Sequence, residues 1–190
     1  MPKTIEYSPS DVEKYRIVTE ILGLEDLAVV SHRYDEATET REFYCGHRWE
    51  IGVCPDCLQL STELHDYPKQ RRIHDTRLRG EKVVLYFDSR RLKCSHCRKP
   101  FTQEVRDVVP ECTYTYRLYE EIADPKRKQD VSTIADHYGL GYKLVESILL
   151  KAGEAKLEGR RKAPLQVTQL GIDEISKKKD MAPISSSLPT

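Results

Sequence analysis

Two short stretches organise this sequence, Cys54-Pro55-Asp56-Cys57 and Cys94-Ser95-His96-Cys97. In each C-x-x-C pair a tight turn can bring the two thiolates to about 3.5–4 Å from each other. Two such turns that face each other offer the tetrahedral four-sulfur shell that Zn²⁺ prefers, with no open position for water or substrate. We therefore predict one structural zinc ion, held by Cys54, Cys57, Cys94 and Cys97.

The alternative for these cysteines is two disulfides or four buried thiols. The chain begins Met1-Pro2-Lys3 and continues into a polar stretch without the features of a secretory leader, which predicts a reducing cytoplasm and disfavours disulfides. Cys45 and Cys112 belong to neither pair and are expected to be ordinary half-buried thiols. His47 and His96 could replace a ligand, but four cysteines already complete the shell.

Length and composition favour small modules over one large core. The chain has 190 residues, of which 38% are hydrophobic and 33% charged, and it contains no apolar run long enough to span a membrane. The sequence therefore predicts a protein without membrane contact.

The net charge of zero conceals an uneven distribution of charge along the chain. Residues 1–66 carry 6 basic and 14 acidic residues, residues 67–100 carry 11 and 3, and residues 101–190 carry 14 of each. A solvated face is one explanation of such a basic run, and nucleic acid is the natural acidic partner. The arginines predicted to contact DNA from this segment are Arg71, Arg72, Arg77, Arg79, Arg90 and Arg91.

The part before the first cysteine pair is predicted to contain a helix and a small antiparallel sheet. Residues 8–23 place apolar side chains at helical spacing, with Ser10 or Asp11 as the cap and Gly23 at the end. Three β-rich runs follow, at residues 28–34, 41–45 and 49–53.

The segment between the cysteine pairs is predicted to form a basic β-hairpin. Its strand candidates, residues 71–75 and 82–88, are separated by Arg79-Gly80, and the second strand alternates charged and apolar side chains. Residues 90–93 then run into the second cysteine pair. We expect zinc to close this hairpin into a module whose small core would not hold without the metal.

Beyond Phe101 the pattern becomes helical. Residues 114–123 predict one helix, and residues 131–138 and 142–150 predict two more, joined by a turn at Gly139. Two short helices around a Gly-containing turn are typical of a helix-turn-helix, and a helical hairpin of a bundle is the alternative. The predicted exposed face of the second helix carries Tyr142, Lys143, Glu146, Ser147 and Lys151.

The last part of the chain is predicted to hold a linker, or the fraying end of a helix, and then one strand. Residues 153–164 are charged, poor in large apolar side chains and closed by Pro164. Residues 165–172 are a strand candidate that ends at Asp173. An acidic residue at the end of a strand can hold a divalent cation, and it can equally start a turn.

Taken together, Arg90-Arg-Leu-Lys-Cys-Ser-His-Cys-x-x-x-Phe101, the preceding C-x-x-C, the helix pair and Leu170-Gly-Ile-Asp-Glu-Ile175 resemble the N-terminal part of bacterial insertion-sequence transposases of the ISL-three family. The resemblance implies a cytoplasmic, nucleoid-associated bacterial protein whose zinc-binding and helix-turn-helix parts bind double-stranded DNA at terminal inverted repeats. It also implies a DDE catalytic domain of ribonuclease-H-like fold with two Mg²⁺ ions, in which Asp173 matches the first carboxylate.

Residues 180–190 depart from the family's expected continuation, a Gly-His-Gly-x-Tyr turn followed by an apolar strand. Codons for this tail, read one base earlier, permit Gly-His-Gly-Thr-Tyr and then apolar residues. We therefore hypothesise a single-base frameshift near Lys179, which sequencing of the surrounding DNA tests. On this hypothesis the chain binds DNA without strand transfer by itself, Mg²⁺ would bind only to a complete catalytic domain, and a homo-oligomer or an intact transposase is a further partner.

The predicted fold is α+β and multi-module: a zinc-ribbon-like antiparallel β module, a helix-turn-helix module and the first strand of a ribonuclease-H-like domain. The predicted boundaries are residues 1–53 for the N-terminal helix and sheet, 54–101 for the zinc module, 110–152 for the helix-turn-helix, 153–164 for the linker, 165–179 for the strand and 180–190 for the tail. A zinc-dependent transcriptional regulator and a zinc-stabilised protein-binding module are the alternative functions.

Overall fold

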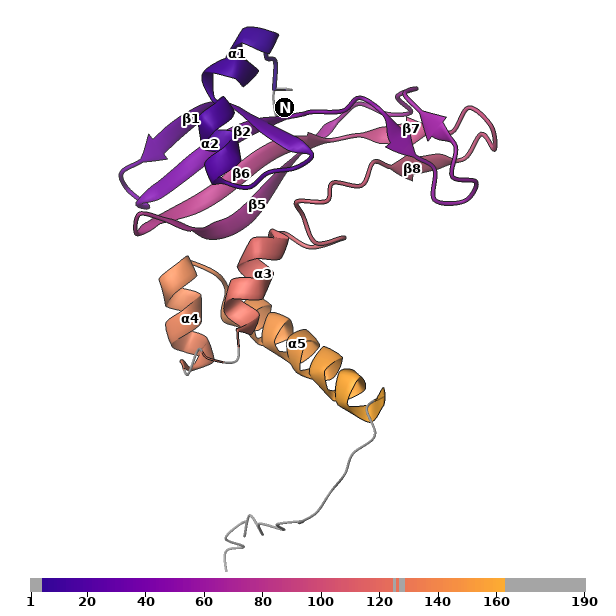
Figure 1. Ribbon diagram of the computed structural model, residues 1–190. Helices are drawn as coiled ribbons and strands as arrows, with labels where there is room; N and C mark the ends of the chain where they lie inside the picture. Colours follow the sequence, from indigo (N-terminus) through magenta and orange to yellow (C-terminus); the bar gives the residue numbers. More distant parts are fainter. Residues whose placement is uncertain (1–4, 125, 127–128, 163–190) are drawn as a thin grey trace, which may run out of the picture. The chain divides into compact units, whose positions relative to one another are not determined.

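The computed structural model describes residues 5–124, 126 and 129–162 (Figure 1). The chain divides into two compact units, residues 1–154 and residues 155–190. The predicted strand at residues 165–172, Asp173 and the tail all lie outside the described residues. Among the residues that are described, no helix has the length and apolar character that crossing a membrane requires.

The secondary structure changes along the chain from a β-rich first part to a helical second part. In chain order the elements are α1 (Pro9–Lys14), α2 (Arg16–Ile21), β1 (Leu27–Asp35), β2 (Thr40–His47), β3 (Gly52–Val53), β4 (Leu60–Ser61), β5 (Lys69–Leu78), β6 (Glu81–Ser89), β7 (Arg91–Lys93), β8 (Pro100–Thr102), α3 (Tyr116–Ala123), α4 (Val131–Tyr138) and α5 (Tyr142–Lys162). The predicted strands and helices before residue 150 therefore form, although the run at residues 49–53 is a strand only at Gly52–Val53 and α5 extends twelve residues beyond its predicted end.

The N-terminal helix is split into α1 and α2 at Tyr15. Its cap is Ser8, so the prediction of Ser10 or Asp11 as the cap was wrong. The Ser8 hydroxyl accepts from the Asp11 N–H, and the Asp11 carboxylate accepts from the Ser8 N–H at 2.9 Å. Pro9 occupies the first helical position, where its missing N–H costs nothing. Gly23, at φ +60°, ends the helical segment as expected.

The main sheet has four strands in the order β1-β2-β6-β5. The outer pairs, β1–β2 and β5–β6, are antiparallel, whereas the central pair β2–β6 is parallel and sets Phe43 opposite Leu85. One face of the sheet packs against α2 and the segment around residues 105–108. Its buried side chains are Leu22, Leu24, Leu27, Val29, Phe43, Cys45, Ile73, Val83, Leu85, Phe87, Val105 and Val108.

The predicted boundary between an N-terminal module, residues 1–53, and a zinc module, residues 54–101, does not hold, because the main sheet contains strands from both. The hairpin β5–β6 is not an independent zinc-closed module, because it shares one sheet and one core with β1 and β2. The physical reason is burial: the apolar face of β6 needs a larger partner than the zinc ribbon, and pairing with β2 supplies one. The hydrophobic cluster around the four cysteines is a separate one.

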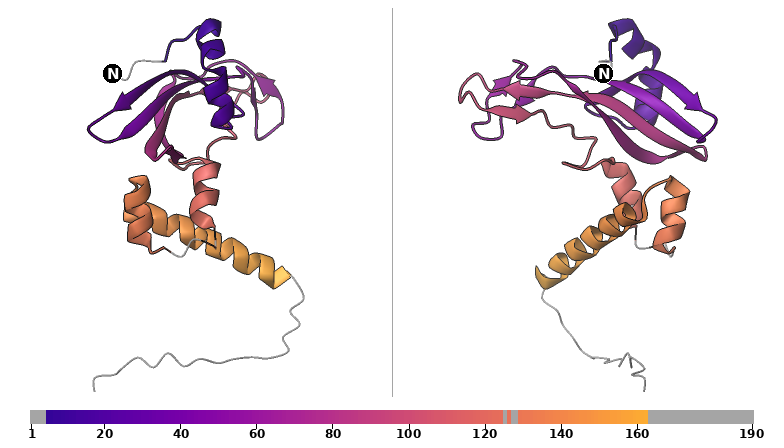
Figure 2. Two further views of the ribbon diagram at one scale, coloured as in Figure 1. Left: turned by 60° about the vertical axis from the view of Figure 1, so that its left-hand side comes forward. Right: turned by 180° about the vertical axis from the view of Figure 1, so that it is seen from behind.

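The three helices α3, α4 and α5 gather together in both views of Figure 2 and share a second core. Asp130 caps α4 by accepting from the Thr133 N–H at 2.9 Å, and Gly139, at φ +65°, ends it. Leu140 is buried in the turn before α5. Of the two interpretations of residues 153–164, a linker or the end of a helix, the structure favours the helix, because α5 continues to Lys162 through a run that contains good helix formers.

A buried carboxylate joins the sheet to the start of α3. Asp75 on β5 accepts from the Thr115 hydroxyl at 2.6 Å and pairs with the Arg117 guanidinium. Thr115 also caps α3 by accepting from the Leu118 N–H at 3.2 Å. Because the Asp75 side chain is fully buried, its charge depends on these partners.

We predict that Asp75→Ala lowers the free energy of unfolding by about 2–3 kcal/mol, because it removes two charge-assisted hydrogen bonds and leaves the Thr115 hydroxyl proton and the Arg117 guanidinium without their acceptor. Urea denaturation of the zinc-loaded chain, followed by far-UV circular dichroism, measures this loss. Asp66→Ala is the matched control, since Asp66 forms an exposed ion pair with Arg91, and it should leave the midpoint unchanged. Equal effects of the two substitutions would contradict this role of Asp75.

A second carboxylate gives the sheet a defined dependence on pH. The Arg106 guanidinium donates to Asp26 at 2.6 and 3.1 Å, and this hydrogen bonding holds the pKa of Asp26 below its usual value. A carboxyl whose pKa is lowered by folding stabilises the fold above the pKa of the unfolded chain, about 3.9, and loses that stabilisation as the pH falls through the lowered folded value.

We therefore predict that Asp26→Asn lowers the melting temperature at pH 7, and that the difference from the wild-type chain shrinks as the pH falls from 4 to 2. Thermal unfolding of both chains at each pH measures this difference. Both lose zinc alike on acidification, so the difference isolates the carboxylate. A difference that does not change with pH would show that the charge of Asp26 is unimportant.

Candidate metal centre and nucleic-acid interface

The two C-x-x-C stretches form two turns of the same construction. In the first, the Cys54 N–H donates to the Gln59 carbonyl and the Leu58 N–H to the Cys54 carbonyl, both at 2.9 Å. In the second, Cys94, Arg98 and Lys99 repeat this pattern. The first turn connects β3 to β4 and the second connects β7 to β8, and each pair of strands is antiparallel.

The residue that follows each C-x-x-C lies in the left-handed region, with φ +60° at Leu58 and φ +61° at Arg98. Glycine adopts this conformation without steric cost, and other residues rarely do. Sequence reasoning missed both positions, because a glycine after each pair would have been the signal for this turn and the sequence has none there.

The turns face each other and bring all four sulfurs together. The Sγ atoms of Cys54 and Cys97 are 3.7 Å apart, those of Cys57 and Cys94 are 3.5 Å apart, and all four lie within 4.8 Å of one another. These distances exceed the S–S bond length of about 2.05 Å, so the pairs are not disulfides. A tetrahedral zinc ion with Zn–S bonds of about 2.3 Å sets its sulfurs about 3.8 Å apart, which this arrangement fits.

The backbone favours a thiolate at Cys94. The Cys97 N–H donates to the Cys94 sulfur at 3.4 Å, and this bond, together with one from the His96 N–H, lowers the pKa of Cys94 to about 6. Hydrogen bonds to a sulfur stabilise its charged form, which is the form that binds metal. Cys54 and Cys94 are buried and the other two are half-buried, so four protein sulfurs complete a structural site.

Backbone hydrogen bonds join the two halves of the ribbon, such as the Lys93 N–H donating to the Glu63 carbonyl at 2.8 Å, but the apolar core between the two turns is very small. Their cluster contains only Cys54, Leu92, Cys94 and Phe101 as buried residues. β3 approaches closely at Gly52, where a Cβ would lie 2.5 Å from Leu92 Cδ1. Loss of the metal should therefore open this ribbon, because a core of this size is too small to fold by itself.

The remaining cysteines and the two candidate histidines are not ligands. Cys45 is buried in the core of the main sheet, where burial raises the pKa of its thiol, and Cys112 is half-buried. His47 Nε2 lies 2.7 Å from the Asp88 carbonyl oxygen. Since a carbonyl only accepts, this nitrogen carries the proton, and burial lowers the pKa of the ring. Among the described residues, the four cysteines form the one cluster that could hold a metal ion.

Basic residues in and beside the second turn pair with acidic residues of the first turn and of the segment that follows it. Lys99 pairs with Asp56 at 2.9 Å and Arg91 with Asp66 at 3.1 Å. Both are exposed ion pairs, which contribute little to stability but reduce the local positive charge. The count of charge along the sequence therefore overstates the positive charge of this turn.

The predicted DNA-contacting arginines of β5 and of the turn that follows it separate into two groups. Arg71 donates to the Cys112 carbonyl and lies over the Phe87 ring, and Arg77 donates to the carbonyls of His137 and Gly80. These two arginines therefore make contacts within the chain. Arg72 and Arg79 are exposed, and Arg72 makes one contact, with the His74 ring at 2.9 Å.

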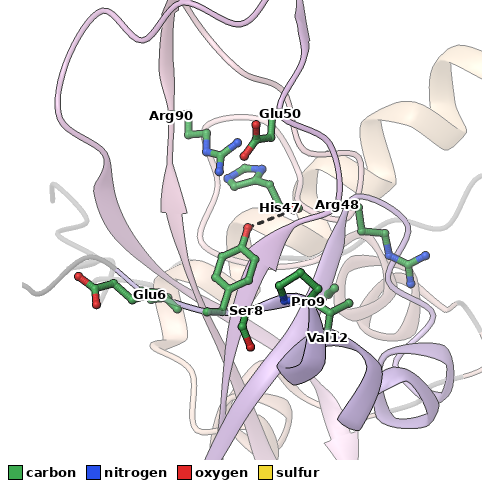
Figure 3. Close-up of a pocket in the computed structure, with 11 residues that line it drawn as sticks. Glu6, Ser8, Pro9, Val12, His47, Arg48, Glu50 and Arg90 are labelled. Carbon is green, nitrogen blue, oxygen red and sulfur yellow. Dashed lines mark hydrogen bonds between the residues drawn. The ribbon is translucent and has the colours of Figure 1, made fainter.

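Arg90 lies at a cavity of about 700 Å³ between the N-terminal segment and the end of β2 (Figure 3). The Arg90 and Glu50 side chains lie beside the His47 ring, and Arg48 extends from another side of the cavity. The wall formed by the N-terminal segment is fixed by the Ile5 N–H, which donates to Asp88 at 2.7 Å. The cavity is lined by the acidic Glu6 and Glu50 as well as the basic Arg48 and Arg90, so it is not a site that selects anions.

The predicted contact residues of α5 lie along the first three turns of that helix. Tyr142, Lys143 and Lys151 are exposed, whereas Ser147 is half-buried. These side chains follow the turn at Gly139 directly. The candidate catalytic residue, Asp173, lies outside the described residues.

The zinc ribbon is the part of the chain that matches a known protein family. Residues 51–97 match the family described as the zinc finger of transposase IS204/IS1001/IS1096/IS1165. This part of the chain is similar to a transposase zinc ribbon. The match begins just before β3, ends at Cys97 and contains all four cysteines, so it supports the predicted resemblance for the ribbon. No curated protein and no solved structure is significantly similar to the chain.

We predict that removing zinc with a chelator opens the ribbon and leaves the main sheet folded, because the two have separate cores. Hydrogen exchange with and without chelator measures this effect. Amides of β3, β4, β7 and β8 should lose protection, and those of β2 and β6 should keep theirs. Cys112→Ser is the control and should retain one zinc ion per chain. Uniform loss of protection would contradict separate cores.

Proposed function

We propose that the protein is the DNA-binding part of an insertion-sequence transposase, which binds double-stranded DNA at the terminal inverted repeats of its element. The observation that carries this proposal is the transposase-type zinc ribbon at residues 51–97, which the helix pair α4–α5 follows along the chain. The ribbon's zinc has a structural role in this proposal. The catalytic role of Asp173 with Mg²⁺ stays a prediction.

The helix pair supports a helix-turn-helix interpretation. Ala135 on α4 and Val145 and Ile148 on α5 are buried in one core. A left-handed Gly139 and a buried Leu140 produce the sharp turn between them. In this interpretation α5 is the recognition helix and its N-terminal residues approach base edges in the major groove. Its contact residues are then Tyr142, Lys143, Ser147 and Lys151.

Phosphate contacts would come from the basic residues that the fold leaves exposed or half-buried. Arg72, Arg79 and Arg90 have no ion pair with a carboxylate among the described residues, and the Arg91–Asp66 pair is exposed enough to exchange for phosphate. We assign Arg71 and Arg77 a positioning role instead, because both donate to backbone carbonyls. Arg77 links β5 to the last turn of α4.

Footprinting of the zinc-loaded chain on the ends of its own genomic locus tests the proposal. We expect protection within the terminal inverted repeats. Protection confined to a promoter would instead favour a transcriptional regulator. Absence of any binding to DNA would contradict both functions.

We predict that Lys143→Ala and Lys151→Ala each weaken DNA binding and reduce the slope of log K against log salt by about 1, because each removes one phosphate contact. Fluorescence anisotropy between about 50 and 300 mM salt measures the slope. Lys14→Ala, on the exposed side of α1, is the matched control and should change neither quantity. Affinity that does not depend on salt would contradict phosphate contacts altogether.

A further inference from the structure

The first turn of the zinc ribbon presents an apolar surface that the proposed DNA contacts do not use. We name it the ribbon face, and it consists of Trp49, Ile51, Val53, Leu58 and Leu60, which are 60, 48, 55, 75 and 62% exposed. Val53 and Leu60 are cross-strand partners on β3 and β4, and Ile51 precedes Val53 by two residues, so these three share one side of the hairpin. A soluble surface seldom gathers five large apolar side chains without a partner.

Leu58 is the protruding part of this face. It is the most exposed of the five and lies at φ +60°, a conformation that L side chains rarely adopt and that glycine adopts freely. Arg98 holds the same conformation in the second turn, with Glu63 3.9 Å away. The turn therefore imposes this conformation on either residue, whereas the exposure of a large apolar side chain at Leu58 adds no buried surface to the isolated fold and points to contact with another molecule.

A groove lies on the same part of the ribbon. Its volume is about 340 Å³, which is enough to admit a leucine side chain, and Trp49, Ile51 and Val53 line its apolar part. Gln103, Glu104 and the paired residues Asp26 and Arg106 form its polar part. The lining carries two carboxylates, Asp26 and Glu104, against the one guanidinium of Arg106, and this charge does not favour nucleic acid as the occupant.

We propose that the ribbon face joins two copies of this chain about a two-fold axis, with Leu58 of each copy inserted into the Trp49–Ile51–Val53 groove of the other. A knob and a groove on the same surface are the elements that a self-complementary interface needs. The five side chains expose on the order of 500 Å² per copy, and with their polar surroundings they approach the roughly 800 Å² per partner of a standard interface. The proposal does not depend on DNA binding.

Sedimentation velocity of the zinc-loaded full chain, without DNA, tests this interface at concentrations from about 1 to 100 µM. We expect a concentration-dependent dimer. High salt should not dissociate it, since its contacts are apolar. A monomer over the whole range would overturn the proposal and leave the ribbon face to a different partner.

Leu58→Gly separates the interface from the fold. It removes the knob and at the same time relieves the left-handed conformation, so it should raise the dimer dissociation constant at least about tenfold while the melting temperature is kept or raised. Arg98→Gly is the matched control: it changes the same position of the other turn and should leave the dissociation constant unchanged. An unchanged dimer in Leu58→Gly would overturn the proposal.

Ile51→Glu decides the question if Leu58→Gly fails to retain zinc. This substitution leaves both turns intact and places a carboxylate in the groove beside Glu104, where like charge and loss of apolar contact oppose insertion of the knob. We expect a zinc-loaded monomer. A dimer as stable as the wild type would overturn the proposal.

Discussion

The parallel pairing of β2 with β6 is the constraint on which the rest of the fold depends. Because the two strands run in the same direction, both deliver the chain to the same end of the sheet. β2 ends at His47, shortly before Cys54, and β6 ends at Ser89, shortly before Cys94. The parallel pairing therefore brings the two cysteine turns to the same end of the sheet. Zinc then connects the segment that follows β2 to the segment that follows β6. In Figure 1, β7 and β8 accordingly continue beyond one end of the sheet.

In this arrangement the metal stabilises the zinc ribbon and not the main sheet. The sheet has its own core, and the ribbon has few buried apolar residues beyond its cysteines. Zinc therefore fixes the ribbon, including the strained Leu58 and the ion pairs around the second turn, at the end of a sheet that is already stable. The helical core is held to the other part of the sheet by polar links, above all through Asp75 and Arg77.

The sequence predicted the parts of the fold whose signals are local. The C-x-x-C pairs, the alternation in β6 and the end of α4 at Gly139 each depend on residues a few positions apart, and the structure confirms those elements. The β2–β6 pairing joins residues about forty positions apart, and no local pattern reports it. The same holds for Arg71 and Arg77. From the sequence alone, both are positively charged residues in a basic segment. The backbone carbonyls to which they donate are known only from the structure.

X-ray absorption at the zinc edge of the purified chain tests the central claim most directly, that four thiolates hold a structural ion at the end of the parallel pair. The account predicts one zinc ion per chain with four sulfur neighbours at about 2.3 Å and no nitrogen or oxygen ligand. A shell with fewer sulfurs, or with a histidine or water ligand, would contradict it. A spectrum of that kind would show that the two turns do not meet as Cys54, Cys57, Cys94 and Cys97 do in this structure.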